Sequence, residues 1–159
     1  MLSAIEFDGQ TGLYTRQAFF HHASMLLGSS PDGTYQAVAV DIHNFKQVNS
    51  IYGENVGDDI IQYLAGKLKR LVPEGLVAHY DGDSFVCLES VTAHTDAELE
   101  KDIRGIAKAA PIRNLFLKCG VYCCENTSLP VSVICNRAFL ALNSIKDCLL
   151  YTSPSPRDV

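Results

Sequence analysis

The chain has 159 residues, of which 47% are apolar and 19% are charged, and its formal net charge is -5. This length and composition predict one globular domain with a sizeable core, and they do not indicate disorder for its bulk. The acidic balance offers no basic stripe to replace the counterions of a phosphate backbone, which disfavours a general nucleic-acid-binding protein. An acidic protein that handles phosphates has to neutralise them locally, with a metal ion or with helix N-termini.

The six cysteines form no C-x-x-C pair and mostly lie in apolar runs. Buried free thiols in a reducing cytosol are therefore expected, rather than disulfides or a zinc site. Residues 1–10 lack the basic-then-apolar pattern of a signal peptide, and no run of about 18 apolar residues occurs in the chain. We therefore expect a cytoplasmic protein without a membrane segment.

The chain begins with a polar, glycine-containing segment over residues 8–16, which precedes apolar residues at helical spacing. This spacing predicts an amphipathic helix over residues 16–27. Thr11 or Thr15 could cap that helix. The Ser-Ser-Pro-Asp-Gly sequence within residues 28–34 predicts a turn after it.

Residues 35–42 are apolar on both faces, which is typical of a strand in the centre of a sheet. Asp41 interrupts this strand, and its carboxylate must be solvated or paired because an isolated buried charge is very unfavourable. A metal ligand and a simple cap for the next turn are both open interpretations. Residues 44–57 are expected to form a loop or a short helix, followed by a longer helix that starts near Asp58 and ends before Pro73.

An Asp-Gly pair between two β-prone runs predicts a hairpin near the middle of the chain. Asp81 and Gly82 would form the tip of a type I′ turn, which needs a positive φ at both central residues. Asp83 follows the tip directly. If the fold carries Asp41 to the same place, the two carboxylates provide the raw material of a Mg²⁺ site.

The second half of the chain predicts a charged amphipathic helix over residues 96–110, a strand over residues 115–124 and a helix over residues 130–145. The order is therefore helix, strand, helix, hairpin, helix, strand, helix. This order fits an α+β fold close to the ferredoxin-like plan, with a mixed or antiparallel sheet flanked by helices.

Three short motifs stand out along this order: D-G-Q-T-G-L-Y-T-R at residues 8–16, D-I-H-N-F-K-Q-V-N at residues 41–49, and D-G-D-S-F at residues 81–85. Together they resemble the GGDEF family, the nucleotidyl cyclase domain that condenses two GTP into cyclic di-GMP. The resemblance covers roughly residues 8–146. It implies a nucleotidyl cyclase fold and a GTP site that holds Mg²⁺.

The resemblance assigns roles to individual residues. It implies that Asp41, Ile42 and Asp83 hold Mg²⁺, and that Asn49 and Asp58 read the guanine edge. An amide and a carboxylate suit that role because they can pair with the ring N–H groups and the carbonyl of guanine. The alternative is that both residues only cap turns. The further nucleotide-binding positions that the resemblance implies are Phe45, Lys46, Asp81 and Gly82.

Departures from the family pattern are concentrated at the positions that lie closest to the reacting groups in the family. Asp81 replaces the first glycine of the signature and places a negative charge where phosphates would approach. Ser84 replaces a glutamate that the family is thought to need for activating the attacking hydroxyl, and a serine cannot act as that base near neutral pH. Asp83 is then the remaining candidate for a catalytic group. Further departures from the family motifs lie at His43, His79, residues 72–75 and Asn143.

These departures predict a degenerate GGDEF domain that binds GTP as a regulatory module and has little or no cyclase activity. One alternative is an active diguanylate cyclase, with Asp83 and a water replacing the missing glutamate. Another is an interaction or dimerisation domain that binds no nucleotide. A metal site built from His43, His79 and the aspartates is disfavoured, because single histidines near a polar cleft are usually only hydrogen-bonded.

The surroundings of the domain are also implied by the resemblance. A cyclase of this family needs two domains face to face, each presenting one GTP, so a homodimer is possible. The segment over residues 136–146 is similar to domains that precede an EAL phosphodiesterase domain. Residues 148–159 contain two prolines and no periodicity, and they resemble a translated sequencing adapter. We therefore expect a domain over residues 1–147 and a non-native tail.

Overall fold

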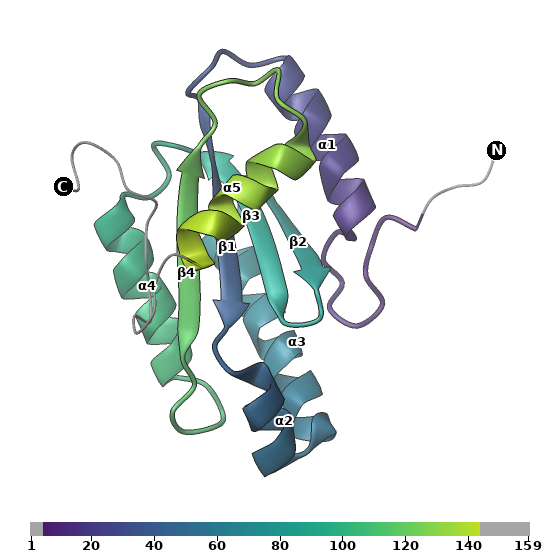
Figure 1. The fold of residues 1–159 in the computed structure, drawn as a ribbon, viewed down its shortest axis with the longest axis vertical. Helices are drawn as coiled ribbons and strands as arrows, with labels where there is room; N and C mark the ends of the chain where they lie inside the picture. The colour runs from purple at the N-terminus through teal and green to yellow at the C-terminus, as the bar shows by residue number, and fades with distance from the viewer. Residues whose placement is uncertain (1–4, 144–159) are drawn as a thin grey trace.

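The computed structural model describes residues 5–143, which fold into a sheet flanked by helices (Figure 1). The elements in chain order are α1 Arg16–Gly28, β1 Tyr35–Ile42, α2 Phe45–Tyr52, α3 Glu54–Leu71, β2 Leu76–Asp81, β3 Ser84–Ser90, α4 Asp96–Lys108, β4 Leu117–Cys123 and α5 Val131–Asn143. The predicted tail and Cys148 lie outside the described residues. No helix in the described part of the chain is long and apolar enough to span a bilayer.

The sheet has the strand order β2-β3-β1-β4, and every neighbouring pair is antiparallel. This is the arrangement of the ferredoxin-like plan, so the predicted α+β fold is confirmed in its antiparallel form. β1 lies between β3 and β4, which explains why its sequence is apolar on both faces. The central strand therefore ends in the middle of one edge of the sheet.

Helices cover both faces of the sheet and enclose two clusters of buried side chains. On one face, side chains from α3 and α4 pack on Val38, Val40 and Phe85. On the other face, side chains from α1 and α5 pack on Ala37, Ala39 and other small or branched residues. Figure 1 shows α5 crossing in front of the sheet on this second face. Small residues on the second face let the helices lie close to the strands.

Gly120 marks the closest approach between α5 and the sheet. A Cβ at this position would lie 2.3 Å from the carbonyl oxygen of Ala138 and 2.6 Å from the amide nitrogen of Leu142. Contacts this short would force the helix away from β4. The absence of a side chain at Gly120 therefore sets how closely α5 covers this part of the sheet.

None of the five described cysteines forms a disulfide with another described residue, and four of them are buried. Burial raises the pKa of Cys124 and Cys135 to about 12, and it raises the pKa of Cys87 and Cys119 well above the usual range. Because the thiolate is the reactive form, these side chains are inert. They contribute to the core as small apolar residues.

The two helices after β1 differ from the sequence-based expectation. Residues 44–57 do include a short helix, α2, but α3 begins at Glu54 instead of near Asp58. The two helices are separated by Gly53 alone, which has a φ of 91°. Glycine adopts this left-handed region without steric cost, so the chain turns sharply with no intervening loop.

The hairpin is present, but its tip differs from the type I′ turn that the sequence predicts. Asp81 pairs with Ser84, so the two loop residues are Gly82 and Asp83. Neither Asp81 nor Gly82 has a positive φ. The register shifts between His79 and Asp81, and such an irregularity adds the local twist that a type I′ turn would otherwise provide. Asp83 therefore lies in the turn itself.

The remaining elements agree with the predicted ones to within a few residues. Of the two candidate caps for α1, Thr15 is the one used, because its Oγ1 accepts a hydrogen bond from the amide of Ala18 at 3.2 Å. Thr95 and Glu98 form a capping box at the start of α4. α4 ends at Lys108, two residues before its predicted end, and β4 is shorter than predicted at both ends.

Candidate functional site

The end of β1 and the tip of the β2-β3 hairpin meet at one edge of the sheet. The amide nitrogen of Ile42 donates a hydrogen bond to the carbonyl oxygen of Asp83 at 3.2 Å. Asp41 pairs with Ser84 on β3 and with Lys118 on β4. The structure therefore brings together the carboxylates of Asp41 and Asp83, which are 42 residues apart in the sequence.

The environment of Asp41 opposes its negative charge. Burial, followed by the negative charge of Asp83 and a hydrogen bond with it, raises the pKa of Asp41 to about 7. The positive charge of Lys118 and the amide of Ile42 act in the opposite direction but do not compensate. The Oδ1 atom of Asp41 is buried and has no hydrogen-bond partner among the described residues. Such an oxygen is costly unless a proton or a cation occupies the position beside it.

Asp41, Ile42 and Asp83 fit a Mg²⁺ ion that is shared with a phosphorylated ligand. Within residues 5–143, no group of three or more His, Cys, Asp or Glu side chains could hold a metal. Mg²⁺ is commonly bound by one or two carboxylates, with water and phosphate oxygens completing its shell. Asp41 and Asp83 provide that number of carboxylates. The side chain of Ile42 is a hydrocarbon without a ligand atom, so this residue can offer only its main-chain oxygen.

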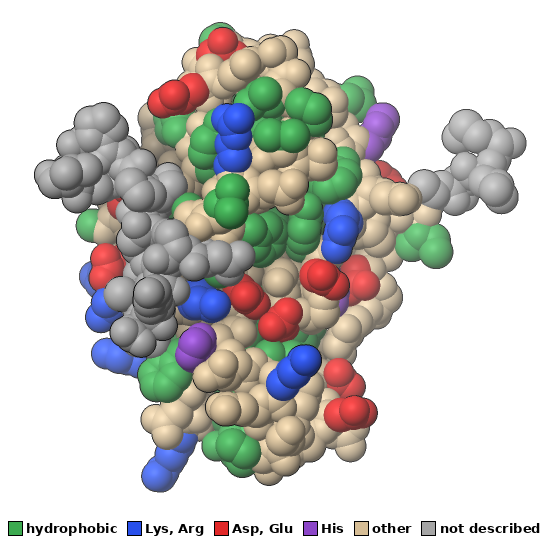
Figure 2. All heavy atoms as spheres, viewed as in Figure 1, with side chains coloured by type: hydrophobic (Ala, Val, Ile, Leu, Met, Phe, Trp, Pro, Cys, Tyr) green, Lys and Arg blue, Asp and Glu red, His purple; other side chains and the backbone are tan. Residues whose placement is uncertain are grey.

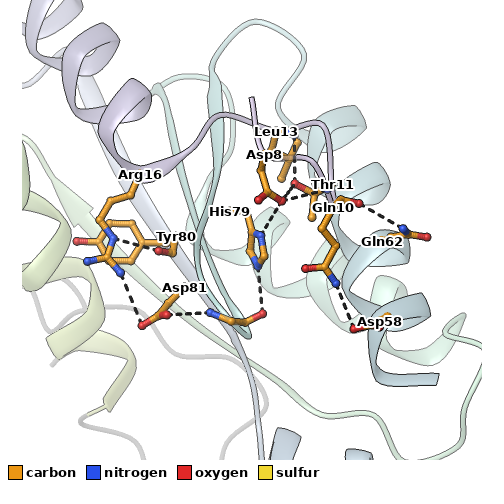
Figure 3. Close-up of polar contacts among 11 residues, drawn as sticks. Asp8, Gln10, Thr11, Leu13, Arg16, Asp58, Gln62, His79, Tyr80 and Asp81 are labelled. Atoms are coloured by element: carbon orange, nitrogen blue, oxygen red, sulfur yellow. Dashed lines mark hydrogen bonds and ion pairs between the residues drawn. The ribbon is translucent and has the colours of Figure 1, made fainter. Parts of the chain in front are cut away.

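The contact between α2 and α3 brings Asn49 against the residue that precedes Asp58. A Cβ at Gly57 would lie 1.9 Å from Oδ1 of Asn49 and 3.2 Å from the Cζ of Phe45. The Asn49 amide therefore lies against the bare main chain of Gly57, one residue before Asp58. The side chain of Asp58 is exposed, and its Oδ1 accepts a hydrogen bond from Nε2 of Gln10 at 3.3 Å (Figure 3).

Neither Asn49 nor Asp58 is the N-cap of a helix. Asn44 is the N-cap of α2 and Gly53 is the N-cap of α3, while Asn49 and Asp58 lie within the helices. Two further positions that were predicted to bind the nucleotide lie on α2 and differ in burial. Phe45 packs partly against the core, and Lys46 is exposed.

A hydrogen-bond network connects the segment before α1 with the hairpin tip (Figure 3). Nδ1 of His79 lies 2.9 Å from Oδ2 of Asp8, and Nε2 of the same ring lies 3.1 Å from the carbonyl oxygen of Gly82. Both partners are hydrogen-bond acceptors, and which ring nitrogen donates depends on the tautomer of His79. The ring also stacks on Phe85 at a centroid distance of 5.2 Å. His79 thus holds the turn that carries Asp83.

Asp8 is stabilised in its ionised form by the same network. Burial opposes ionisation, but hydrogen bonds from the Thr11 side chain and from His79, together with the Thr11 amide, lower the pKa of Asp8. The Oδ2 atom of Asp8 accepts from the Thr11 amide at 3.0 Å and from the Thr11 hydroxyl at 2.8 Å. Asp8 therefore supplies a fixed negative charge beside His79.

Asp81 has a counter-ion that the sequence reasoning did not identify. The Arg16 guanidinium lies 3.7 Å from Oδ2 of Asp81, donates from Nε to the carbonyl oxygen of Tyr80 at 3.0 Å, and stacks over the Tyr80 ring (Figure 3). Oδ1 of Asp81 accepts from the amide of Gly82 at 2.9 Å. The extra charge at the hairpin tip is thus directed toward Arg16. Arg16 belongs to the first sequence motif, but nothing in that motif indicates a partner so far along the chain.

Three other positions that depart from the family pattern, Ser84, His43 and His79, are held by main-chain or side-chain contacts. Ser84 is the first residue of β3, half-buried, and paired with both Asp41 and Asp81 in the sheet register. The amide of His43 donates to the carbonyl oxygen of Phe116 at 2.8 Å. His79 is engaged with Asp8 and Gly82, so the structure does not assemble the two histidines and the aspartates into one metal-binding cluster.

The fold and the carboxylate pair define an α+β domain of the nucleotidyl cyclase type. Residues 5–148 match the family model described as "Diguanylate cyclase, GGDEF domain". The chain therefore belongs to the GGDEF family, and the resemblance of its sequence motifs is confirmed. Membership places the domain in cyclic di-GMP signalling.

Known proteins similar to this chain include one sequence relative and two solved structures. The signaling protein YkoW of Bacillus subtilis is 29% identical over 115 residues, which cover 68% of this chain and 14% of YkoW. The GGDEF domain of DgcB from Caulobacter crescentus, in complex with c-di-GMP, has a TM-score of 0.74 at 21% identity and covers 98% of this chain and 97% of that chain.

The second structure is the S helix-GGDEF-EAL chain of Vibrio cholerae LapD, bound to c-di-GMP, which has a TM-score of 0.66 at 18% identity. The match covers 95% of this chain and 38% of that chain. At these identities, both structures show that the fold is shared. This chain spans only about one seventh of the length of YkoW.

Proposed function

We propose that this chain is a GTP-binding regulatory domain that makes little or no cyclic di-GMP. The observation that carries the proposal is the carboxylate pair Asp41 and Asp83, with a buried Asp41 oxygen that has no partner among the described residues. A cation between the carboxylates and a phosphate chain would satisfy that oxygen. Ser84, in contrast, supplies no carboxylate beside this pair.

Guanine recognition is assigned to Asn49 and Asp58. Support comes from the contact of Asn49 with Gly57 and from the exposed carboxylate of Asp58, the next residue on α3. The carboxylate can accept from the ring N–H and the amino group of guanine, and the amide can donate to a ring acceptor. Gln10 donates to Asp58 and would have to give up this bond or share it when guanine binds.

Asp41, Ile42 and Asp83 would hold the Mg²⁺ ion that accompanies the triphosphate. Mg²⁺, when bound, would neutralise part of the phosphate charge and allow both carboxylates to remain ionised beside it. Asp83 is then committed to the metal, which weakens the alternative in which Asp83 and a water replace the missing base. Loss of one positioned acid or base typically costs a factor of about 10² to 10⁴ in rate.

The assembly around the domain belongs to the same proposal. We infer a cytoplasmic protein in which this domain precedes an EAL domain, as the name of the LapD chain describes for that protein. GTP binding here would change the activity or position of the downstream domain. A homodimer of these domains is the arrangement in which two bound GTP molecules could face each other.

The test is a calorimetric titration of the full chain with GTP and Mg²⁺, together with an assay for cyclic di-GMP. We expect micromolar binding with no product. Asp58→Ala should weaken binding by about 10- to 100-fold, because a charge-assisted hydrogen bond is lost. Asp59→Ala removes the same charge from the neighbouring exposed position and is the matched control.

Each of the alternatives gives a different result in this experiment. Accumulation of cyclic di-GMP by the wild-type chain would establish an active cyclase and contradict the regulatory proposal. The absence of heat at millimolar GTP would remove both nucleotide-binding functions and leave an interaction domain. Equal weakening by Asp58→Ala and Asp59→Ala would reject the assignment of Asp58 to guanine.

A further inference from the structure

Lys118 lies beside the carboxylate pair although no sequence motif includes it. It is the residue of β4 that pairs directly with Asp41. Directly paired residues of antiparallel strands project to the same face, with Cβ atoms about 4.5 to 5.5 Å apart. The positive charge of Lys118 favours the ionised form of Asp41, and it therefore opposes the increase in the pKa of that carboxyl group.

The packing of α5 leaves this lysine at the border of the covered surface. Gly120 lies two residues further along β4 on the same face, where α5 approaches closest to the sheet. Lys118 lies nearer to the start of β4 and is half-buried. Figure 2 shows this side of the molecule, where acidic side chains gather near the middle, with basic side chains on both sides.

The charges near the site create a requirement for an additional cation. A nucleoside triphosphate carries several negative charges, and one Mg²⁺ ion shared with two carboxylates cannot neutralise all of them. The Arg16 guanidinium is already engaged with Asp81 and with Tyr80. Lys118 has no carboxylate of the described residues within ion-pair distance, so its ammonium group can be shared with a ligand.

We propose that Lys118 binds the phosphate chain of the nucleotide, and that it makes the site select a triphosphate over the bare nucleoside. This inference rests on the proposed GTP-binding function and deepens it. A flexible lysine can follow the phosphate oxygens while its stem packs along the sheet. The same ammonium would lie near Asp41 when no ligand is bound and near the phosphates when the ligand enters.

The experiment compares binding of Mg²⁺-GTP and of guanosine to the full chain, measured by titration calorimetry and by NMR chemical shifts. Lys118→Ala should weaken GTP binding by about 10- to 100-fold, because a hydrogen bond between charged groups is lost. Guanosine binding should change by less than about twofold. Lys118→Arg should retain most of the GTP affinity, and Lys118→Gln provides a second neutral variant of similar length if the alanine variant does not fold.

Two further variants complete the comparison. Lys101→Ala removes the same charge from an exposed position on α4, which packs on the opposite face of the sheet, and should leave both affinities unchanged. Asn49→Ala should weaken GTP and guanosine alike, because it acts on the base. This pattern separates the phosphate end of the site from the guanine end.

The results that would overturn the inference are specific. Unchanged GTP affinity in Lys118→Ala and Lys118→Gln would reject Lys118 as a phosphate ligand, and so would equal weakening of GTP and guanosine. If either result occurs while Asp58→Ala still weakens GTP binding, the proposed function stands and only the role of Lys118 fails. If the wild-type chain binds neither ligand, both proposals fail.

Discussion

Nδ1 of His79 lies 2.9 Å from Oδ2 of Asp8, which joins two residues that are 71 positions apart in the sequence. The other ring nitrogen reaches the carbonyl oxygen of Gly82 at 3.1 Å. A single side chain therefore couples the segment before α1 to the turn that carries Asp83. A change in the N-terminal segment can reach the carboxylate pair through this one imidazole ring.

Substitution of His79 should therefore loosen the hairpin tip. In His79→Ala, the free energy of unfolding should fall by about 1.5 to 3 kcal/mol, because a largely buried, charge-assisted hydrogen bond is lost and Asp8 loses a partner. Urea unfolding measures this change. His21→Ala removes an exposed histidine of α1 and is the control, which should alter stability by less than about 0.5 kcal/mol. Similar losses in both variants would contradict a special role for His79.

The pKa of Asp41 predicts the pH dependence of stability in the absence of metal. Because the pKa is about 7 in the folded state and near 3.8 in the unfolded state, the folded protein binds the proton more tightly between these values. The contribution of this group is fully present below about pH 4 and is lost as the pH rises through about 7. We expect the urea midpoint to fall over this range.

Asp41→Asn is the comparison for the pH experiment. The asparagine side chain does not titrate, so the decrease between about pH 4 and pH 7 should be smaller in the variant than in the wild-type chain. Groups that do not interact with Asp41 titrate alike in both proteins and cancel in the difference. Parallel curves for the two proteins would show that Asp41 does not carry the pH dependence.

Gly57 and Gly66, both on α3, provide a matched pair for testing the guanine end of the site. In Gly57→Ala the new Cβ would collide with the Asn49 amide, so GTP affinity should fall by about tenfold or more. In Gly66→Ala nothing lies within 4 Å of the new Cβ, so the free energy of unfolding should rise by about 0.5 to 1 kcal/mol without any effect on binding. Unchanged GTP binding in Gly57→Ala would remove Asn49 from the site.

If the site has lost only its catalytic groups, restoring the family residues at the hairpin should restore diguanylate cyclase activity. The double variant Asp81→Gly with Ser84→Glu places a carboxylate next to Asp41 in the register and removes the charge at the tip. We expect cyclic di-GMP to accumulate in this variant and not in the wild-type chain, since a positioned base contributes about 10² to 10⁴ in rate. Ser84→Ala with Asp81→Gly is the control without a base. No product from either variant would show that further groups are missing.

The sequence by itself determined the fold class and most of the elements. Apolar runs and helical spacing are local properties, and they predicted β1 at its observed bounds and the helices to within a few residues. The three motifs identified the family. The hairpin turn was predicted one residue too early. Asp81 still pairs with Ser84, so the turn consists of Gly82 and Asp83.

Only the tertiary structure decided which charges meet at the site. The pairing of Lys118 with Asp41 depends on the register between β4 and β1, and a shift of one residue would turn that lysine to the other face. The contact of Asn49 with Gly57 depends on the sharp turn at Gly53. Motifs along the chain specify which side chains are available. Strand register and helix packing decide their distances, and because electrostatic interactions depend on distance and burial, the chemistry of this site is set by the fold.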